Sequence, residues 1–546
     1  MNAEKPRVLF PKDEPTLWID LKSGRAIDHT GRIGPIPAGP RRKSPNLTDC
    51  LDAAGRGMYQ RLVFVGHVPP PREDVRHWLY VDTPGWKPLQ RWRNPAAGRF
   101  TPTNPNEDED ANPKRFAVEV RTSGEWFGSL DLNPAQARDA WAALWSTITQ
   151  LSPGSRELGL MRSPAATGTN LWAASLPRDL KLTPTPQDIR DELHFTSGQH
   201  HIDQFVQGSE CDCGDCRALV TPTEAGKIPG FFYVDGRFMY SSVCRELGIA
   251  GKRITGEECR QLLFFSEKGR YARARYRVSA RVPDDWPTLG LLPAKKEGTR
   301  DWHYPNRPGA TFETWIDGAE ADLALNAGWE LNPHEGILFT KARVMDTFAE
   351  RITKGRTAVE ADPDLDPIVK KAVTGALRQI LISGIGNLAS RGRPVEKRAD
   401  TLREVPEDYR HEAMQHGKHY VWTEPAERNT VAGNNWYWPE LSVQVWGRAR
   451  ARVLNTPAAN KFRGGALAVP PDTLIGINGD AIYTTELPAW ALPTMIGGGD
   501  DGKPGRLRIQ GGLPRPQNAP LDRDALNKLR ERAEREGTTH LTRGTR

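Results

Sequence analysis

Cysteine is scarce in this 546-residue chain, and long apolar runs are missing from it. Six cysteines over this length are too few for a disulfide framework, so a reducing, cytoplasmic environment is expected. No run of 18 apolar residues occurs, so the sequence predicts no membrane-spanning helix and no membrane partner. The opening residues, MNAEKPRVLFPKDEPTLW, lack the charged and then apolar order of a signal peptide.

The remaining composition is that of a globular, mildly basic protein. Hydrophobic residues make up 38% and charged residues 26%, and 75 Lys and Arg against 68 Asp and Glu give a formal net charge of +7. This charge is compatible with an anionic partner without being diagnostic of one. A chain of this length is expected to divide into roughly three or four domains or subdomains.

The stretch 230–243, GFFYVDGRFMYSSV, carries most of the functional interpretation. Four apolar residues lead into Asp235, and a carboxylate at the end of a buried strand is a natural metal ligand. The same letters also fit a hairpin, because Asp-Gly between two apolar runs is a strong turn signal. Both interpretations stay open on this stretch alone.

Two acidic strand ends, Asp20 and Asp82, suggest a comparison with 3′-5′ exonucleases. Such a site needs several convergent carboxylates to hold two metal ions. Asp20 is followed by Leu-Lys and Asp82 by Thr-Pro-Gly, so neither has a second acid at a working spacing. We therefore expect both to begin solvated loops and not to form a proofreading site.

Three closely spaced thiols, Cys211, Cys213 and Cys216, could hold a structural Zn²⁺ if a fourth ligand arrives from elsewhere. No second Cys-x-x-Cys pair completes the pattern. Free cysteines in a Gly-Asp loop are the alternative.

Two later segments predict helices with cationic faces. In the helix expected over 366–388, Lys371 and Arg378 lie seven residues apart and share a face. A helix begins at Pro439, where Arg448 and Arg452, four residues apart, form a stripe suited to phosphates. A solvated helix face would look the same.

A hairpin is predicted over 473–485, because two strand-like runs flank an Asn-Gly turn. Asp480 stands just after that turn. An Asp after a strand, a basic helix and an Asp on a hairpin are the parts needed for nucleotidyl transfer. Two carboxylates hold two metal ions, and cations grip the triphosphate.

These residues resemble, in order and type, the family-B DNA polymerases, particularly the compact protein-primed branch of phages, linear plasmids and mobile elements. Asp235-Gly-Arg-Phe-Met-Tyr240-Ser resembles motif A, usually Asp-x-x-Ser-Leu-Tyr-Pro. The Asp and the Tyr are kept, while Phe238 replaces Ser and Ser241 replaces Pro.

Motifs B and C are similar to two further stretches. Arg378-Gln-Ile-Leu-Ile-Ser383-Gly-Ile-Gly resembles Lys-x-x-x-Asn-Ser-x-Tyr-Gly, with Ile in place of Asn and Tyr. Gly-Ile-Asn478-Gly-Asp480-Ala resembles Tyr-x-Asp-Thr-Asp-Ser, keeping the second Asp while Asn478 replaces the first. The likeness covers about residues 165–510.

The resemblance implies an α+β fold shaped as a right hand. Its parts would be a degenerate exonuclease-like α/β domain over 1–165, a palm over 166–340 and 431–487, fingers over 341–430, and a short thumb-like region over 488–546.

The resemblance also implies a DNA-directed DNA polymerase acting on primer-template DNA and dNTPs with Mg²⁺ or Mn²⁺, alongside a terminal protein or other replication protein. Asp235 and Asp480 would be the catalytic metal ligands. The expected nucleotide-binding residues are Tyr240, which would exclude a 2′-OH, with Lys371, Arg378 and Ser383. The expected DNA-binding residues are Arg448, Arg452, Lys503, Arg506 and Arg508.

Two other functions fit the same residues. A catalytically decayed polymerase-like protein would bind DNA as a replication factor, and the altered motif B favours it. An unrelated metal-dependent nuclease would use the same acids, but cations for a triphosphate would be redundant in hydrolysis by water.

Overall fold

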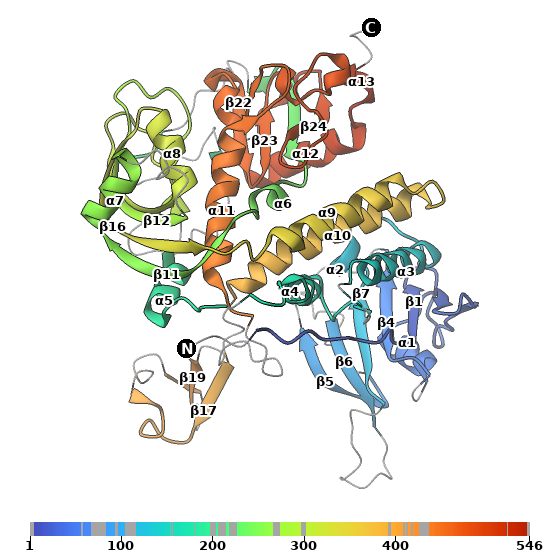
Figure 1. Ribbon diagram of the computed structural model, residues 1–546. Helices are drawn as coiled ribbons and strands as arrows, with labels where there is room; N and C mark the ends of the chain where they lie inside the picture. The colour runs from blue at the N-terminus through green and yellow to red at the C-terminus, as the bar shows by residue number, and fades with distance from the viewer. Residues whose placement is uncertain are drawn as a thin grey trace. The chain divides into compact units, whose positions relative to one another are not determined.

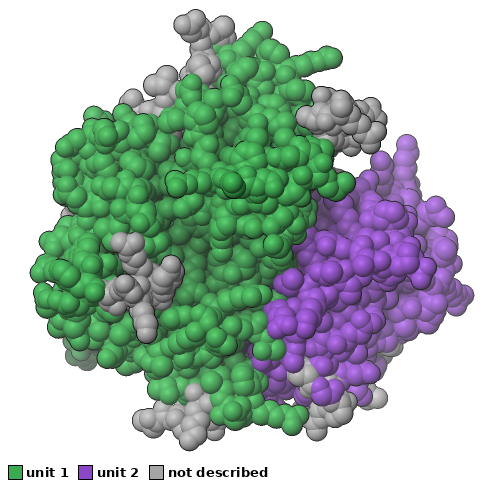
Figure 2. All heavy atoms as spheres, turned by 45° about the horizontal axis from the view of Figure 1, so that its top comes forward, with its two compact units in different colours: residues 1–6, 176–349, 385–546 green, residues 7–175, 350–384 purple. Residues whose placement is uncertain are grey.

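The computed structural model has a mixed α+β fold and is drawn in Figure 1. It describes residues 5–55, 58–66, 83–92, 97–103, 116–152, 154, 157–180, 182–196, 204–205, 214–217, 226–265, 273–295, 302–390, 395–407, 410, 413–416, 419–424, 436–520 and 522–542. Contacts divide the chain into two compact units, coloured separately in Figure 2. Unit 1 comprises residues 1–6, 176–349 and 385–546, and unit 2 comprises residues 7–175 and 350–384. No helix among the described residues is long and apolar enough to cross a bilayer.

Unit 2 is built on a seven-stranded sheet with the strand order β3-β2-β1-β4-β7-β6-β5. The three strands β1, β4 and β7 run parallel, and the other pairs are antiparallel. The strands are β1 (Thr16–Asp20), β2 (Arg25–Asp28), β3 (Ile33–Pro35), β4 (Arg61–Val65), β5 (Trp86–Trp92), β6 (Ala97–Pro102) and β7 (Val118–Thr122). The helices are α1 (Leu47–Ala54), α2 (Gly124–Phe127), α3 (Pro134–Gln150) and α4 (Pro164–Ser175), with most of α9 (Asp346–Ala361) and α10 (Pro367–Leu388).

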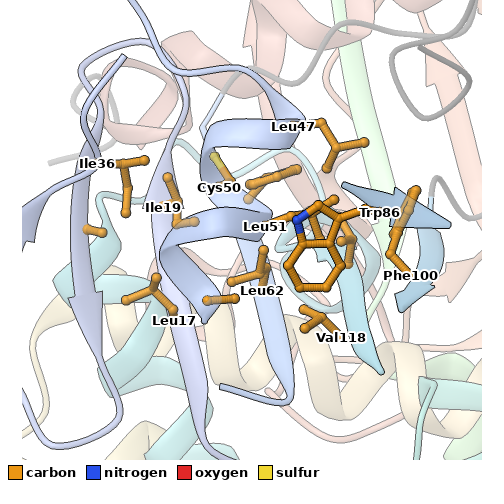
Figure 3. Packing of buried hydrophobic residues seen from close by; sticks show 14 residues of the cluster. Leu17, Ile19, Ile36, Leu47, Cys50, Leu51, Leu62, Trp86, Phe100 and Val118 are labelled. Carbon is orange, nitrogen blue, oxygen red and sulfur yellow. The ribbon is translucent and has the colours of Figure 1, made fainter. Parts of the chain in front are cut away.

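The core of this sheet forms because alternate strand residues face the same side. Leu17 and Ile19 of β1 pack with Leu62 of β4 beneath α1, which contributes Cys50 and Leu51 (Figure 3). Helix α1 begins at a reciprocal cap, in which the Asn46 side chain and that of its third helical residue each accept a backbone N–H.

Helix α10 confirms the helix predicted over 366–388 and packs closely on α4. A Cβ built at Gly168 of α4 would lie 2.2 Å from the carbonyl oxygen of Ile380 and 2.8 Å from Cα of Gly384. No side chain fits at this contact, so both positions require glycine.

Substituting Gly168 by Ala should therefore lower the free energy of unfolding by about 1–3 kcal/mol, the usual cost of overpacking. Gly375→Ala is the matched control on α10, since a Cβ there meets nothing within 4 Å. That variant should be stabilised by about 0.5–1 kcal/mol. Urea unfolding of both variants gives the comparison, and equal midpoints would contradict the close contact.

Unit 1 contains a five-stranded sheet with the order β24-β10-β23-β22-β8. Its strands are β8 (Gln204–Phe205), β10 (Phe231–Gly236), β22 (Leu474–Asn478), β23 (Ala481–Thr484) and β24 (Leu507–Leu513). Helix α12 (Arg523–Glu536) packs its apolar side on Phe231, Tyr233 and Tyr483. We call this sheet the site sheet.

The site sheet tests two predicted hairpins. The hairpin predicted over 473–485 is confirmed as β22 and β23. The hairpin interpretation of 230–243 is wrong, because β10 pairs with β23 and β24 and the chain then enters α6 (Met239–Val243). The connection passes through Phe238, whose φ of 50° is rare for a bulky residue.

A second sheet of unit 1 has the order β11-β16-β12-β15. Its elements are α5 (Gln187–Thr196), β11 (Gly248–Thr255), α7 (Gly256–Arg260) with a π-helical continuation (Gln261–Phe265), β12 (Ala274–Arg281), β15 (Thr311–Asp317), α8 (Gly318–Asn326), β16 (Glu330–Lys341) and α11 (Pro439–Leu454). The helix predicted to begin at Pro439 is thereby confirmed. Strand β12 alternates basic and apolar residues, and Arg275 on this strand is fully buried.

Smaller elements complete unit 1. Strands β17 (Val395–Ala399), β18 (Met414–His416) and β19 (His419–Glu424) form a separate sheet. The paired short strands are β9 (Lys227–Ile228) with β25 (Gln517–Asn518), β13 (Ala294–Lys295) with β14 (Trp302–His303), and β20 (Thr456–Pro457) with β21 (Arg463–Gly464). Single 3-10 turns span Ala466–Ala468, Pro471–Thr473, Ala489–Ala491 and Thr494–Ile496, and α13 (Thr539–Thr542) follows α12.

Charged side chains are buried between α8 and α11. Nε of Arg450 lies 2.6 Å from a carboxylate oxygen of Glu320, and both residues are buried. Asp317 caps α8 by accepting the N–H of Ala319 at 3.0 Å. Burial raises the pKa of Asp317 to about 6, against the opposing effect of Arg448.

This raised pKa makes stability depend on pH in a defined direction. The folded protein holds a proton on Asp317 between about pH 4 and pH 6 that the unfolded chain releases, so the folded state loses stability as pH rises through that window. Asp317→Asn keeps the cap but cannot ionise. Its stability relative to the parent should rise by on the order of 2 kcal/mol from pH 4 to pH 6 and stay level above. Urea unfolding at stepped pH values measures the difference, and a flat profile would refute it.

Candidate active site

Two carboxylates meet at one end of the site sheet. Asp235 is opposite Ala481 in the antiparallel pair of β10 and β23, and Asp480 immediately precedes Ala481. The N–H of Gly236 donates to the carbonyl oxygen of Asp480 at 3.1 Å. A Cβ built at Gly236 would lie only 2.6 Å from a carboxylate oxygen of Asp480. The Asp480 side chain therefore occupies the space beside the residue that follows Asp235.

Local sequence explains why the carboxylates are fixed there. Strand β10 is buried along its whole length, and Asp235 is only 4% exposed. In the turn between β22 and β23, Gly479 adopts a φ of 61°, which the Asn-Gly turn requires. On the opposite side of β10, Arg508 of β24 is the register partner of Asp235, so both side chains share one face of the sheet.

The Gly-rich segment 496–508 lies directly beside these strands. Its backbone exchanges two 2.7 Å hydrogen bonds with Arg237, and the Arg237 guanidinium pairs with Asp500 at 2.7 Å. Arg506 forms a two-pronged ion pair with Asp501 at 2.8 and 3.0 Å. Hydrogen bonds from Arg506 hold the pKa of Asp501 well below its usual range.

The other predicted cation of this segment, Lys503, is also engaged. Its ammonium lies 3.2 Å from the carboxylate of Asp501, and its side chain is 73% exposed. Of the three predicted cations, Arg508 is therefore beside Asp235 in the sheet, whereas the side chains of Lys503 and Arg506 are paired with Asp501. The acids at 500 and 501 were not predicted, although two Asp residues between Gly and basic residues are a visible signal.

The two arginines predicted to form a stripe on α11 are in different surroundings. Arg448 donates hydrogen bonds to the carbonyl oxygens of Val243 and Arg245, at 3.4 and 2.5 Å, just where α6 ends. Arg452 is half-buried, and burial followed by the charge of Arg506 lowers its pKa. Tyr240 lies on α6 and is 7% exposed. Arg448 therefore anchors the helix that carries Tyr240.

The predicted nucleotide-binding residues of α10 belong to unit 2, whereas Asp235 and Asp480 belong to unit 1. Lys371 is exposed and Arg378 is half-buried on α10. The hydroxyl of Ser383 accepts a hydrogen bond from Gln379 at 2.8 Å.

The oxygen ligands of Asp235 and Asp480 suit Mg²⁺ or Mn²⁺. Magnesium is usually held by one or two carboxylates, with water and substrate phosphates as its other ligands. Across the described ranges, no group of three or more His, Cys, Asp or Glu side chains gathers to hold a metal. An ion here would take its remaining ligands from water and nucleotide.

Four further residues singled out in the sequence are Asp20, Asp82, Cys211 and Cys213. Asp20 accepts hydrogen bonds from the N–H of Lys22 at 2.9 Å and from the hydroxyl of Ser23 at 2.5 Å, so it closes its own turn. Asp82 lies outside the described residues, as do Cys211 and Cys213.

No protein-family model matches this chain, and no curated protein matches it either. Among solved structures, the chain is similar to a DNA polymerase. The matching structure is "Phi29 DNA Polymerase, orthorhombic crystal form". The two sequences are 11% identical, the TM-score is 0.48, and the match covers 92% of this chain and 85% of that chain. Its ternary complex with primer-template DNA and incoming nucleotide substrates gives 10% identity and a TM-score of 0.49, over 92% and 86% of the two chains.

Proposed function

We propose that this chain is a template-directed DNA polymerase that transfers nucleotidyl groups from dNTPs to a primer 3′-OH. The observation that carries the proposal is the meeting of Asp235 and Asp480 at one end of neighbouring strands, beside a cationic segment. Replication of a phage, plasmid or other mobile element is the expected setting. In this proposal the site sheet belongs to a palm, α9 and α10 to fingers, the C-terminal region to a short thumb, and the N-terminal sheet to an inactive exonuclease-like domain.

Asp235 and Asp480 would hold divalent metal ions, which when bound supply charge stabilisation at the attacking and leaving oxygens. The two carboxylates are held by strand pairing, so little reorganisation is needed when substrate arrives. The negative charges of the two carboxylates would thus be in position before the reaction begins.

The remaining residues would bind and orient. Tyr240 would stack under the sugar of the incoming nucleotide, and Lys371, Arg378 and Ser383 would contact its triphosphate. Arg452, Lys503, Arg506 and Arg508 would contact DNA phosphates. Arg448 would act on the nucleotide site indirectly, through its hydrogen bonds to the end of α6.

A catalytically decayed DNA-binding protein is the second candidate. The observation that favours it is Asn478, an amide where the resembled motif has a carboxylate. An amide oxygen binds a divalent cation without contributing negative charge, which weakens the site.

Primer extension on a defined template, with Mg²⁺ or Mn²⁺, tests the proposal. We expect dNTP-dependent extension that follows the template sequence. Binding of primer-template without extension under either metal would replace the polymerase with the binding protein. Metal-dependent degradation of the primer without dNTPs would support a nuclease instead.

A further inference from the structure

One carboxylate of unit 1, that of Glu246, is the common partner of three cations. Its oxygens lie 2.5 Å from Nζ of Lys341, 2.8 Å from Nη2 of Arg343 and 2.7 Å from Nη2 of Arg273. Hydrogen bonds from Lys341 and then Arg343 lower the pKa of Glu246 to about 2, so this carboxylate is ionised at neutral pH. We call these four residues the Glu246 cluster.

The backbone of the Glu246 cluster is held in an unusual conformation. Glu246 and Arg343 adopt φ values of 53° and 50°, in the left-handed region that residues other than glycine rarely occupy. Nε of Arg273 donates to the carbonyl oxygen of Glu246 at 2.8 Å, and the N–H of Glu246 donates to the carboxylate of Asp346 at 2.8 Å. Strained residues persist where surrounding contacts fix them, and they gather at binding sites.

The charges of this cluster favour an anion stronger than a carboxylate. Three cations face the carboxylates of Glu246 and Asp346, so these five side chains carry a net charge of +1. The side chains of Lys341, Arg343 and Glu246 are 42%, 64% and 38% exposed. Ion pairs this exposed contribute little stability, so an incoming anion displaces the carboxylate at low cost. A phosphate group suits the arginines, which bind its oxygens in pairs.

The Glu246 cluster begins close to α6, the helix that carries Tyr240. Arg448 donates hydrogen bonds to the carbonyl oxygens of Val243 and Arg245, which fixes the short connection to Glu246. Three residues of helix and three residues of extended chain place the Cα atoms of Tyr240 and Glu246 within about 15 Å of each other. A DNA strand advances about 3.4 Å per nucleotide, so this distance spans four or five nucleotides.

We propose that the Glu246 cluster binds a backbone phosphate of DNA within about five nucleotides of the point where a nucleotide is added, and that Glu246 occupies this phosphate site until DNA displaces it. The inference rests on the proposed function only for placing the incoming nucleotide at Tyr240. The carboxylate keeps the three cations aligned in the free protein, which lowers the entropy lost on binding. It also competes with the phosphate, so its removal should strengthen DNA binding.

Glu246→Gln should raise the affinity of the full chain for primer-template DNA by about fivefold, the effect of one unit charge about 4 Å from a phosphate in water. The decline of log affinity with log salt should steepen by up to about 0.9, because the released cations now displace counterions from DNA. Fluorescence anisotropy of a labelled primer-template over a range of salt concentrations measures both quantities.

Glu335→Gln is the matched control for this variant. Glu335 lies on β16, pairs with Arg277 at 3.1 Å and Arg253 at 3.8 Å, and is 36% exposed, close to the 38% of Glu246. The control removes the same charge from a similar ion-pair network elsewhere in unit 1. It should leave DNA affinity and its salt dependence unchanged.

Variants of the cations test the same site in the opposite direction. Lys341→Gln and Arg343→Gln change exposed side chains and should each lower DNA affinity by about fivefold, whereas Arg277→Gln, at a side chain that is 45% exposed, should not. Parental or weaker DNA binding by Glu246→Gln, or parental binding by both cation variants, would refute the proposal and leave the cluster a structural junction.

Two further results separate this inference from neighbouring ones. Tighter binding of a dNTP or pyrophosphate by Glu246→Gln, with DNA affinity unchanged, would assign the phosphate to a nucleotide and overturn the DNA assignment. The expected changes in DNA affinity, in a parent protein that extends no primer, would support the phosphate site while refuting the polymerase.

Discussion

Asp235→Asn and Asp480→Asn are each expected to lower the rate of primer extension by on the order of a thousandfold or more, with primer-template affinity almost unchanged. Asparagine keeps the shape and much of the hydrogen bonding of aspartate but removes the charge that holds a divalent ion. Affinity for DNA rests on cations that contact phosphates, so losing a nearby negative charge should not weaken it and can raise it slightly.

Single-turnover extension beside a DNA-binding titration at fixed salt separates the two effects. Asp472→Asn is the matched control, because Asp472 is an exposed acid in the 3-10 turn that leads into β22, the strand before Asp480. That variant should extend at the parental rate. If either site variant also extends at the parental rate, the assignment of its carboxylate is wrong.

Gly236→Ala is expected to reduce extension by on the order of a hundredfold without unfolding the protein. The added methyl group would lie 2.6 Å from the carboxylate of Asp480 and 2.9 Å from Cβ of Met239, so the carboxylate must move. A displacement of about 1 Å in a catalytic site can cost this much in rate.

The measurement is the extension rate, with a thermal melt to establish folding. Gly34→Ala provides a control for glycine in a strand, since a Cβ at Gly34 meets nothing within 4 Å. Parental activity in Gly236→Ala would show that the position of Asp480 beside Gly236 does not matter to the reaction.

Local signals in the sequence were sufficient to place each of the two carboxylates, Asp235 and Asp480, next to the end of a strand. An apolar run ending in Asp235, and an Asn-Gly turn before Asp480, predict where each strand ends. Their meeting follows from the pairing of β10 with β23, which joins segments far apart in the chain. The same pairing excludes the local hairpin at Asp235. Short-range turn chemistry could not exclude it, because an Asp-Gly turn between two apolar runs fits the hairpin as well.

Basic residues were harder to interpret, because a cation in a sequence does not reveal its partner. Arg275 appears in an alternating basic strand, yet tertiary packing buries it completely. Arg448 fits a phosphate-binding stripe, yet its guanidinium binds main-chain carbonyls. The contact of Gly168 with α10 is likewise invisible locally, because glycine in a helix gives no sign of which helix approaches it.

The ion pairs of Asp501 with Lys503 and Arg506 bear on how DNA binding would respond to salt. A free surface cation that meets a phosphate displaces condensed counterions from DNA, and each such contact steepens the fall of affinity with salt. A cation already paired with a carboxylate must first give up that partner, which then recruits a counterion of its own. Contacts made by Lys503 and Arg506 would therefore release fewer ions overall. The salt dependence of binding would be shallower than the number of basic residues at the site implies.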